Sequence, residues 1–152
     1  MKTFLVLGIA FILSACTSQE GHLKKAALTQ ADLKWTESLQ AEAREALTTS
    51  EVLQTAYLEF MKKNSEVQIE DVAFQGENRA TVSVVVSSIP LPLRQTLLKV
   101  ASQVTPDKTR RFNFQDALGP VAEQSGHKTA PEKRPFAVYK FSKSEDGLWR
   151  PE

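Results

Sequence analysis

The chain has one cysteine, Cys16, and two histidines, His22 and His127. An intrachain disulfide needs two cysteines, so none can form. The sequence contains no H-E-x-x-H, C-x-x-C, G-x-S-x-G or P-loop motif, which removes the common metal, redox, hydrolase and nucleotide signatures. The sequence therefore predicts a protein that is not an enzyme and that needs no cofactor or metal.

Long hydrophobic runs and an excess charge are also lacking. The hydrophobic run over residues 4–13 follows Lys2 and has ten residues without a charge, whereas a membrane-spanning helix needs about 20, and the sequence has no second run of that kind. The formal net charge of +1 gives no strong attraction to nucleic acid. What is present is an ordinary globular composition, 41% hydrophobic and 24% charged over 152 residues, which suits one domain.

The end of the hydrophobic run, Leu13-Ser14-Ala15-Cys16, resembles the lipobox of bacterial prolipoproteins. The resemblance implies that diacylglycerol is attached to the Cys16 thiol. It also implies cleavage between Ala15 and Cys16 and acylation of the new amino terminus. Several acyl chains anchor a protein firmly, because each buried CH₂ contributes about 0.8 kcal/mol. The remaining alternative is a conventional cut after Ala15 that leaves a free thiol.

The resemblance also implies a location. In enterobacteria-like systems an aspartate directly after the lipidated cysteine retains the protein in the inner membrane, and this chain has Thr17 there. We therefore expect the periplasmic face of the outer membrane. The expected organisation is a signal peptide over residues 1–15, the lipidated cysteine and a polar tether over 16–27, and a single domain over 28–152.

Hydrophobic periodicity predicts the elements of that domain. Helices are expected over residues 29–47, from 48 to 64 with a Thr48/Glu51 capping box, and over 93–104. Strands are expected over 67–74, 80–88, 135–142 and 148–150. Residues 107–133 give little signal beyond a short helix over 114–118, which Gly119-Pro120 is expected to end.

This order predicts an α+β fold. With its Asp146-Gly147-Leu148-Trp149 ending, the chain resembles small bacterial lipoproteins of the cystatin-like or NTF2-like type. The resemblance implies N-terminal helices packed on a curved antiparallel sheet of about four strands. No functional residue is transferred from it.

Candidate site residues fall into two groups. Trp35, Tyr57 and Phe74 are the candidate lining of a ligand pocket, although aromatic residues at helical spacing are usually core. The second group follows from charge. Residues 17–77 carry six basic against eleven acidic side chains, and residues 94–143 carry ten against four. A basic patch for anionic envelope components is the interpretation of this excess, with these residues at its centre: Arg110, Arg111, Lys133 and Arg134.

Two smaller features are interpreted as inert. Glu70-Asp71 lies where the apolar parity of the first strand changes, which suggests a β-bulge with two solvated carboxylates. His22 and His127 are expected to be exposed.

Three functions stay open at this point. The first is a non-catalytic lipoprotein domain that binds an envelope protein or a cell-wall component. The second is a small-ligand carrier with a pocket between helices and sheet. The third, disfavoured by the missing motifs, is a small hydrolase or isomerase.

Overall fold

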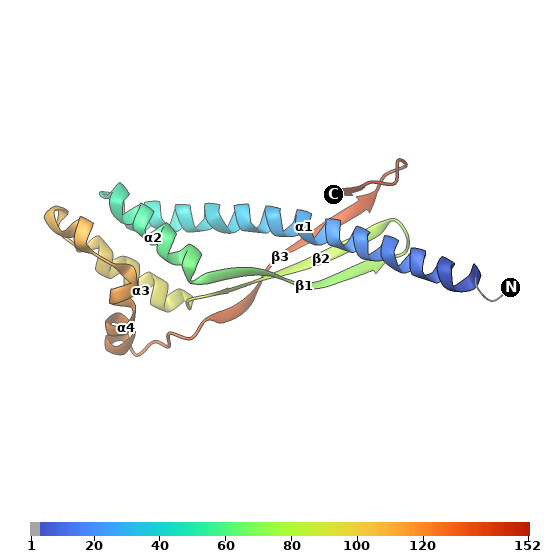
Figure 1. The fold of residues 1–152 in the computed structure, drawn as a ribbon. Coiled ribbons are helices and arrows are strands. Elements are labelled where there is room, and N and C mark those ends of the chain that lie inside the picture. Colours follow the sequence, from blue (N-terminus) through green and yellow to red (C-terminus); the bar gives the residue numbers. More distant parts are fainter. Residues whose placement is uncertain (1–3) are drawn as a thin grey trace. The chain divides into compact units, whose positions relative to one another are not determined.

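The computed structural model describes the backbone of residues 4–152 and the side chains of residues 19–152 (Figure 1). The predicted cleavage and lipidation positions, Ala15 and Cys16, therefore lie outside the described side chains. The elements in chain order are α1 (Phe4–Ala46), α2 (Glu51–Lys63), β1 (Ser65–Gln75), β2 (Arg79–Ser88), α3 (Leu91–Ser102), the 3₁₀ helix η1 (Pro106–Arg111), α4 (Phe114–Ser125), β3 (Glu132–Lys143) and β4 (Trp149–Pro151).

The strands form one four-stranded sheet in the order β1-β2-β3-β4, with β3 and β4 antiparallel. The predicted α+β class with four strands is confirmed. The chain divides into two compact units. Unit 1 comprises Met1–Ala31, Gln68–Val85 and Pro135–Glu152, and unit 2 comprises Asp32–Val67 and Val86–Arg134.

Unit 1 contains the first part of α1 and the part of the sheet that lies next to the two hairpin turns. Alternation in β2 buries Ala80, Val82 and Val84, and Phe141 of β3 is 1% exposed. Both hairpin turns lie at one end of this unit, where the backbone N–H of Lys143 donates to the Asn78 carbonyl at 2.8 Å. The β3–β4 turn is the predicted one, with Gly147 at a φ of +79° that favours glycine.

Unit 2 is mainly helical. Its aromatic core joins α2 to α4, with the Phe114 ring centroid 5.4 Å from that of Tyr57 and 5.7 Å from that of Phe60. Much of the rest of its apolar core comes from α1, α2, α3 and the residue that follows α1, and it includes Leu39, Leu47, Leu53, Met61, Leu93, Leu97 and Leu98. Helix α3 also contacts α4.

The expected tether at residues 16–27 is corrected where the structure describes it. These residues belong to α1, and Leu23 and Ala27 are 1% and 0% exposed. They continue a stripe in which every fourth residue is buried, from Leu23 through Ala27, Ala31, Trp35, Leu39 and Ala43 to Leu47. The polar composition around Leu23 concealed the stripe, because a helix needs only one apolar side.

Two helix boundaries also differ from expectation. Ser50, rather than Thr48, caps α2, since its hydroxyl accepts from the Leu53 N–H at 3.2 Å. Helix α4 does not end at Gly119-Pro120 but continues to Ser125. Burial of Val121 and Ala122 beyond the proline stabilises the continued helix, because tertiary packing outweighs intrinsic propensity. The Asn113 side chain caps α4 by accepting from the Gln115 N–H at 2.8 Å.

Candidate functional site

The most distinctive polar feature of unit 2 is a buried arginine, Arg94 of α3, whose side chain is 4% exposed. It lies among the apolar residues of α3 because the buried face of this helix, which includes Leu93, Leu97 and Leu98, also passes through position 94. Its guanidinium donates to the Ser88 hydroxyl at 3.3 Å and to a carboxylate oxygen of Glu42 at 3.4 Å. Its Nε is buried without a hydrogen-bond partner among the described residues.

Glu42 of α1 connects Arg94 to Tyr57 of α2. The Tyr57 hydroxyl donates to the second carboxylate oxygen of Glu42 at 2.9 Å. Burial, and then the neighbouring Glu42 carboxylate, raise the pKa of the Tyr57 hydroxyl far above its usual value, so Tyr57 stays protonated. We call these residues, Glu42, Tyr57, Ser88 and Arg94, the buried polar network.

Trp35 lies beside this network and is 4% exposed. The guanidinium carbons of Arg94 and Arg134 lie 5.4 Å and 5.6 Å from the centroid of its ring. Its indole N–H donates to the Ser65 hydroxyl at 3.0 Å. Trp35 therefore takes part in cation–π and hydrogen-bond contacts that fix α1 to β1 and α3 within unit 2.

In the structure, Trp35, Tyr57 and Phe74 have other roles than the predicted lining of a ligand pocket. Trp35 and Tyr57 are core residues of unit 2 and border neither of the two grooves described below. Phe74 belongs to unit 1, where it is 46% exposed and packs edge-on against Trp149 at a centroid distance of 6.0 Å. The alternative weighed for the two helical aromatics, that they are core, is the one that the structure supports.

The candidate basic patch is distributed over two elements of unit 2. Arg110 and Arg111 are exposed on η1, and Lys133 is exposed at the start of β3. Arg134 is only half-exposed, because its guanidinium lies over Trp35. Three of the four side chains are therefore accessible cations, and the fourth supports the core.

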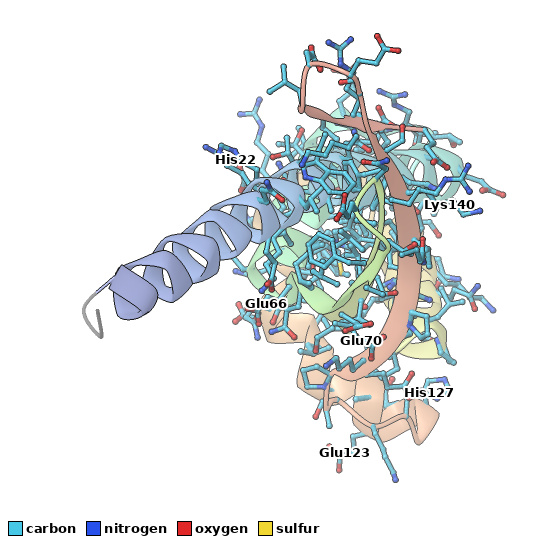
Figure 2. All side chains as sticks on the ribbon, turned by 90° about the vertical axis from the view of Figure 1, so that its right-hand side faces the viewer. His22, Glu66, Glu70, Glu123, His127 and Lys140 are labelled. Carbon is cyan, nitrogen blue, oxygen red and sulfur yellow. The ribbon has the colours of Figure 1, made fainter. Side chains whose placement is uncertain are left out.

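The histidines and the acidic pair lie on the surface. Figure 2 shows His22 on α1 and Lys140 on β3, both in unit 1, on opposite sides of the view. His22 and the Glu70-Asp71 pair are exposed, while His127 is half-buried after the end of α4. Among residues 19–152 the structure contains no group of three or more His, Cys, Asp or Glu side chains able to hold a metal ion.

Two grooves of unit 2 lie well within the volume range of small-molecule sites. One, of about 420 Å³, exposes Glu42 of the buried polar network and is otherwise lined by Glu45, Ala46, Gln95, Leu98, Lys99 and Ser102. The other, of about 600 Å³, is lined by Lys63, Asn64, Ser65, Glu66, Ser87, Ile89, Leu118, Thr129 and Pro131. Both linings are mixed polar and apolar, so both grooves suit a polar ligand or a peptide segment.

Unit 1 carries a different feature at its turns, which we call the turn-end cluster: Phe74, Leu148 and Trp149. Leu148 is 60% exposed in the β3–β4 turn. The Lys143 ammonium lies 5.9 Å from the Trp149 ring centroid. Asp146 holds the turn together by contacting the Ser144 hydroxyl and accepting from the Leu148 N–H at 3.2 Å.

The sequence reasoning missed Glu42 and Arg94. A signal for Arg94 was present, since it occupies a position one turn before Leu97 and Leu98 on the apolar side of α3. The sequence gives no such signal for Glu42, because a glutamate beside a stripe of alanines is typical of a solvated helix face. Only the fold shows that the two charges meet.

No family model, curated protein or solved structure matches the chain in the three comparisons made. Within the described residues, every helix is too short or too polar to pass through a bilayer.

Proposed function

We propose that the chain is a bacterial envelope lipoprotein, anchored through Cys16, whose folded part is a non-catalytic binding or interaction module. The observation that carries the anchor is the sequence Leu13-Ser14-Ala15-Cys16 directly after a short hydrophobic run. The periplasmic face of the outer membrane is the proposed location, because Thr17 follows the cysteine. An envelope protein or a cell-wall component is the proposed partner, and nucleic acid is not.

Two structural observations support the module. The buried polar network holds Glu42 and Arg94 in contact with each other and with Tyr57 and Ser88, so these groups act on protein atoms and stabilise the fold. The accessible cations Arg110, Arg111 and Lys133 and the two grooves are the features of unit 2 available to a partner.

Mass spectrometry of the N-terminal peptide tests the anchor. We expect a peptide that begins at Cys16 and carries a diacylglycerol and an acyl group. Cys16→Ala should remove the modification and release the protein from the membrane fraction, whereas Ser18→Ala, two residues beyond the cysteine, should leave both unchanged. An unmodified peptide from the wild type would refute the anchor.

Cross-linking in intact cells tests the module. The wild type should give discrete adducts with an envelope protein or with peptidoglycan, and Arg110→Glu/Arg111→Glu should weaken them if η1 contributes to the contact. Asp107→Lys, a change on the exposed surface of the same short helix, should not weaken them.

A small-ligand carrier is the second candidate, and the 600 Å³ groove favours it. Its lining offers hydroxyl, amide and ammonium groups beside apolar surface, the combination that orients a small polar molecule. Native mass spectrometry of protein extracted from cells should then detect a bound molecule that is lost in an Asn64→Leu variant.

A further inference from the structure

The turn-end cluster lies at the end of unit 1 toward which the predicted anchor points. Unit 1 meets unit 2 along the chain at Ala31 in α1 and at Gln68 in β1. From there α1 runs back toward its amino end, while β1 runs forward to its turn at Gln75. Figure 1 shows that, in this unit, the amino end of α1 and the two hairpin turns lie at the same end.

The two paths also have nearly the same length. Going back from Ala31 to Cys16 covers 15 residues of α1, which rise about 22 Å at 1.5 Å per residue. Going from Gln68 to Gln75 covers seven residues of β1, which rise about 23 Å at roughly 3.3 Å per residue. Cys16 and the β1–β2 turn therefore lie at similar distances, measured along their elements, from where the chain enters unit 1, and they lie toward the same end of this unit.

The side chains at this end suit the interfacial region of a bilayer. Leu148 and Phe74 are exposed apolar groups, and Trp149 is an aromatic residue of the type enriched where hydrocarbon meets water. The Lys143 ammonium lies over the Trp149 ring. A lysine at an interface can keep its charged group in the polar layer while its stem lies along apolar surface.

Charges around the cluster balance each other. Arg79 lies 4.0 Å from Glu152, and Arg150 lies 2.9 Å from Asp146, measured between guanidinium nitrogen and carboxylate oxygen. Glu77 and Glu145 add negative charge to the two turns. Attraction to anionic headgroups therefore contributes little to membrane contact. The main contribution comes from apolar contact, which the anchor holds in place.

We propose that, in the lipid-anchored protein, the turn end of unit 1 rests on the bilayer and the Leu148 side chain enters its headgroup region. This inference rests on the proposed anchor at Cys16. It adds that unit 1 stands on the membrane in a fixed orientation, with the β3–β4 turn as its contact.

The single cysteine makes a direct test possible. Lipidation blocks the Cys16 thiol, so Leu148→Cys supplies the only reactive thiol of the mature protein. The lipidated full-length variant is labelled with an environment-sensitive fluorophore and reconstituted into vesicles of phosphatidylethanolamine and phosphatidylglycerol that contain spin-labelled lipid. Val138→Cys is the matched control, because Val138 is also in unit 1 and is 62% exposed, against 60% for Leu148, but lies within β3.

The label at 148 should emit at shorter wavelength than the label at 138 and should be quenched several-fold more by the spin-labelled lipid. Replacing the lipids by phosphatidylcholine should change this little. Equal quenching of both labels, or of neither, would overturn the inference, and so would a blue-shifted label at 148 that the lipid does not quench, since protein would then cover it.

The proposed anchor and the proposed orientation can be refuted separately. If wild-type protein itself takes up the thiol label, Cys16 is free, and the proposed anchor falls together with the orientation that depends on it. If wild-type protein resists the label and the site at 148 stays in water, the anchor stands and the orientation alone is refuted. Circular dichroism of both variants should match that of the wild type.

Discussion

The cores of the two units differ in composition. The core of unit 1 is made of aliphatic and aromatic side chains of the sheet, such as Val82, Val84 and Phe141, together with apolar residues of α1. Unit 2 buries comparable apolar residues and, in addition, an arginine paired with a glutamate that also accepts a hydrogen bond from a tyrosine. An apolar contact tolerates many neighbours, whereas a buried charge requires its partners in place. The positions of the core residues are therefore more narrowly defined in unit 2 than in unit 1.

The largest expected effect comes from removing one large core ring in either unit. Phe141→Ala in unit 1 and Phe114→Ala in unit 2 should each lower the free energy of unfolding by about 3–5 kcal/mol, because each leaves a cavity. Denaturant unfolding followed by circular dichroism measures this. Helix α1 and strands β1, β2 and β3 run through both units, so each variant should still show one transition. Two separate transitions would show that the units fold independently.

Next is the removal of one partner from the buried polar network. Glu42→Ala leaves the Arg94 guanidinium buried without its carboxylate and should cost about 3 kcal/mol of stability. The double variant Glu42→Leu/Arg94→Met should recover most of that loss, because an apolar pair removes the burial cost of both charges. A double variant as unstable as Glu42→Ala would mean that packing, rather than charge, dominates at this position.

A smaller effect separates two tyrosines with buried hydroxyl groups, one in each unit. Tyr57→Phe removes the hydrogen bond to Glu42 and should cost about 1 kcal/mol. Tyr139→Phe removes a buried hydroxyl that has no partner among the described residues, so the change should be neutral or slightly stabilising. Burial raises the pKa of Tyr139 as well, so both hydroxyls are protonated near neutral pH. Equal losses in thermal denaturation would contradict the distinction.

The smallest effect concerns the turn that presents Leu148. The Ser144 hydroxyl, followed by the Leu148 N–H and Arg150, lowers the pKa of Asp146 below its usual value. The contribution of the carboxylate is thus complete above the unfolded pKa of about 3.9 and is lost as the pH falls through the lower folded pKa. The amide resonance of Leu148 should shift over that acidic range in the wild type. In Asp146→Ala it should stay constant.

Much of the fold could be predicted from sequence because its elements carry local signals. The Leu53–Met61 stretch has clear helical spacing, and the alternation of β2 is clear in residues 80–84. The burial of Leu23 and the continuation of α4 past Pro120 were not predicted, because the neighbouring residues indicate the opposite. Leu23 is isolated among polar residues, and Pro120 is a strong local stop that packing of Val121 and Ala122 overrides.

The candidate site was less predictable than the fold. The buried polar network joins Glu42, Tyr57 and Arg94, which are distant in the chain, and no local pattern encodes such a meeting. Phe74 was grouped with Trp35 and Tyr57 by residue type alone. The structure assigns it to the other unit, because its strand belongs with the turns rather than with the helices.

The four-residue spacing of the buried stripe in α1 has a consequence for how this sequence can change in length. Removing one residue between Leu23 and Leu47 would rotate every later stripe residue by about 100° and turn it out of the core. Removing four would restore the stripe to within about 40°. The exposed loop around residues 128–131 has no such constraint. Insertions and deletions should therefore be tolerated in that loop and, within α1, should occur in steps of whole turns.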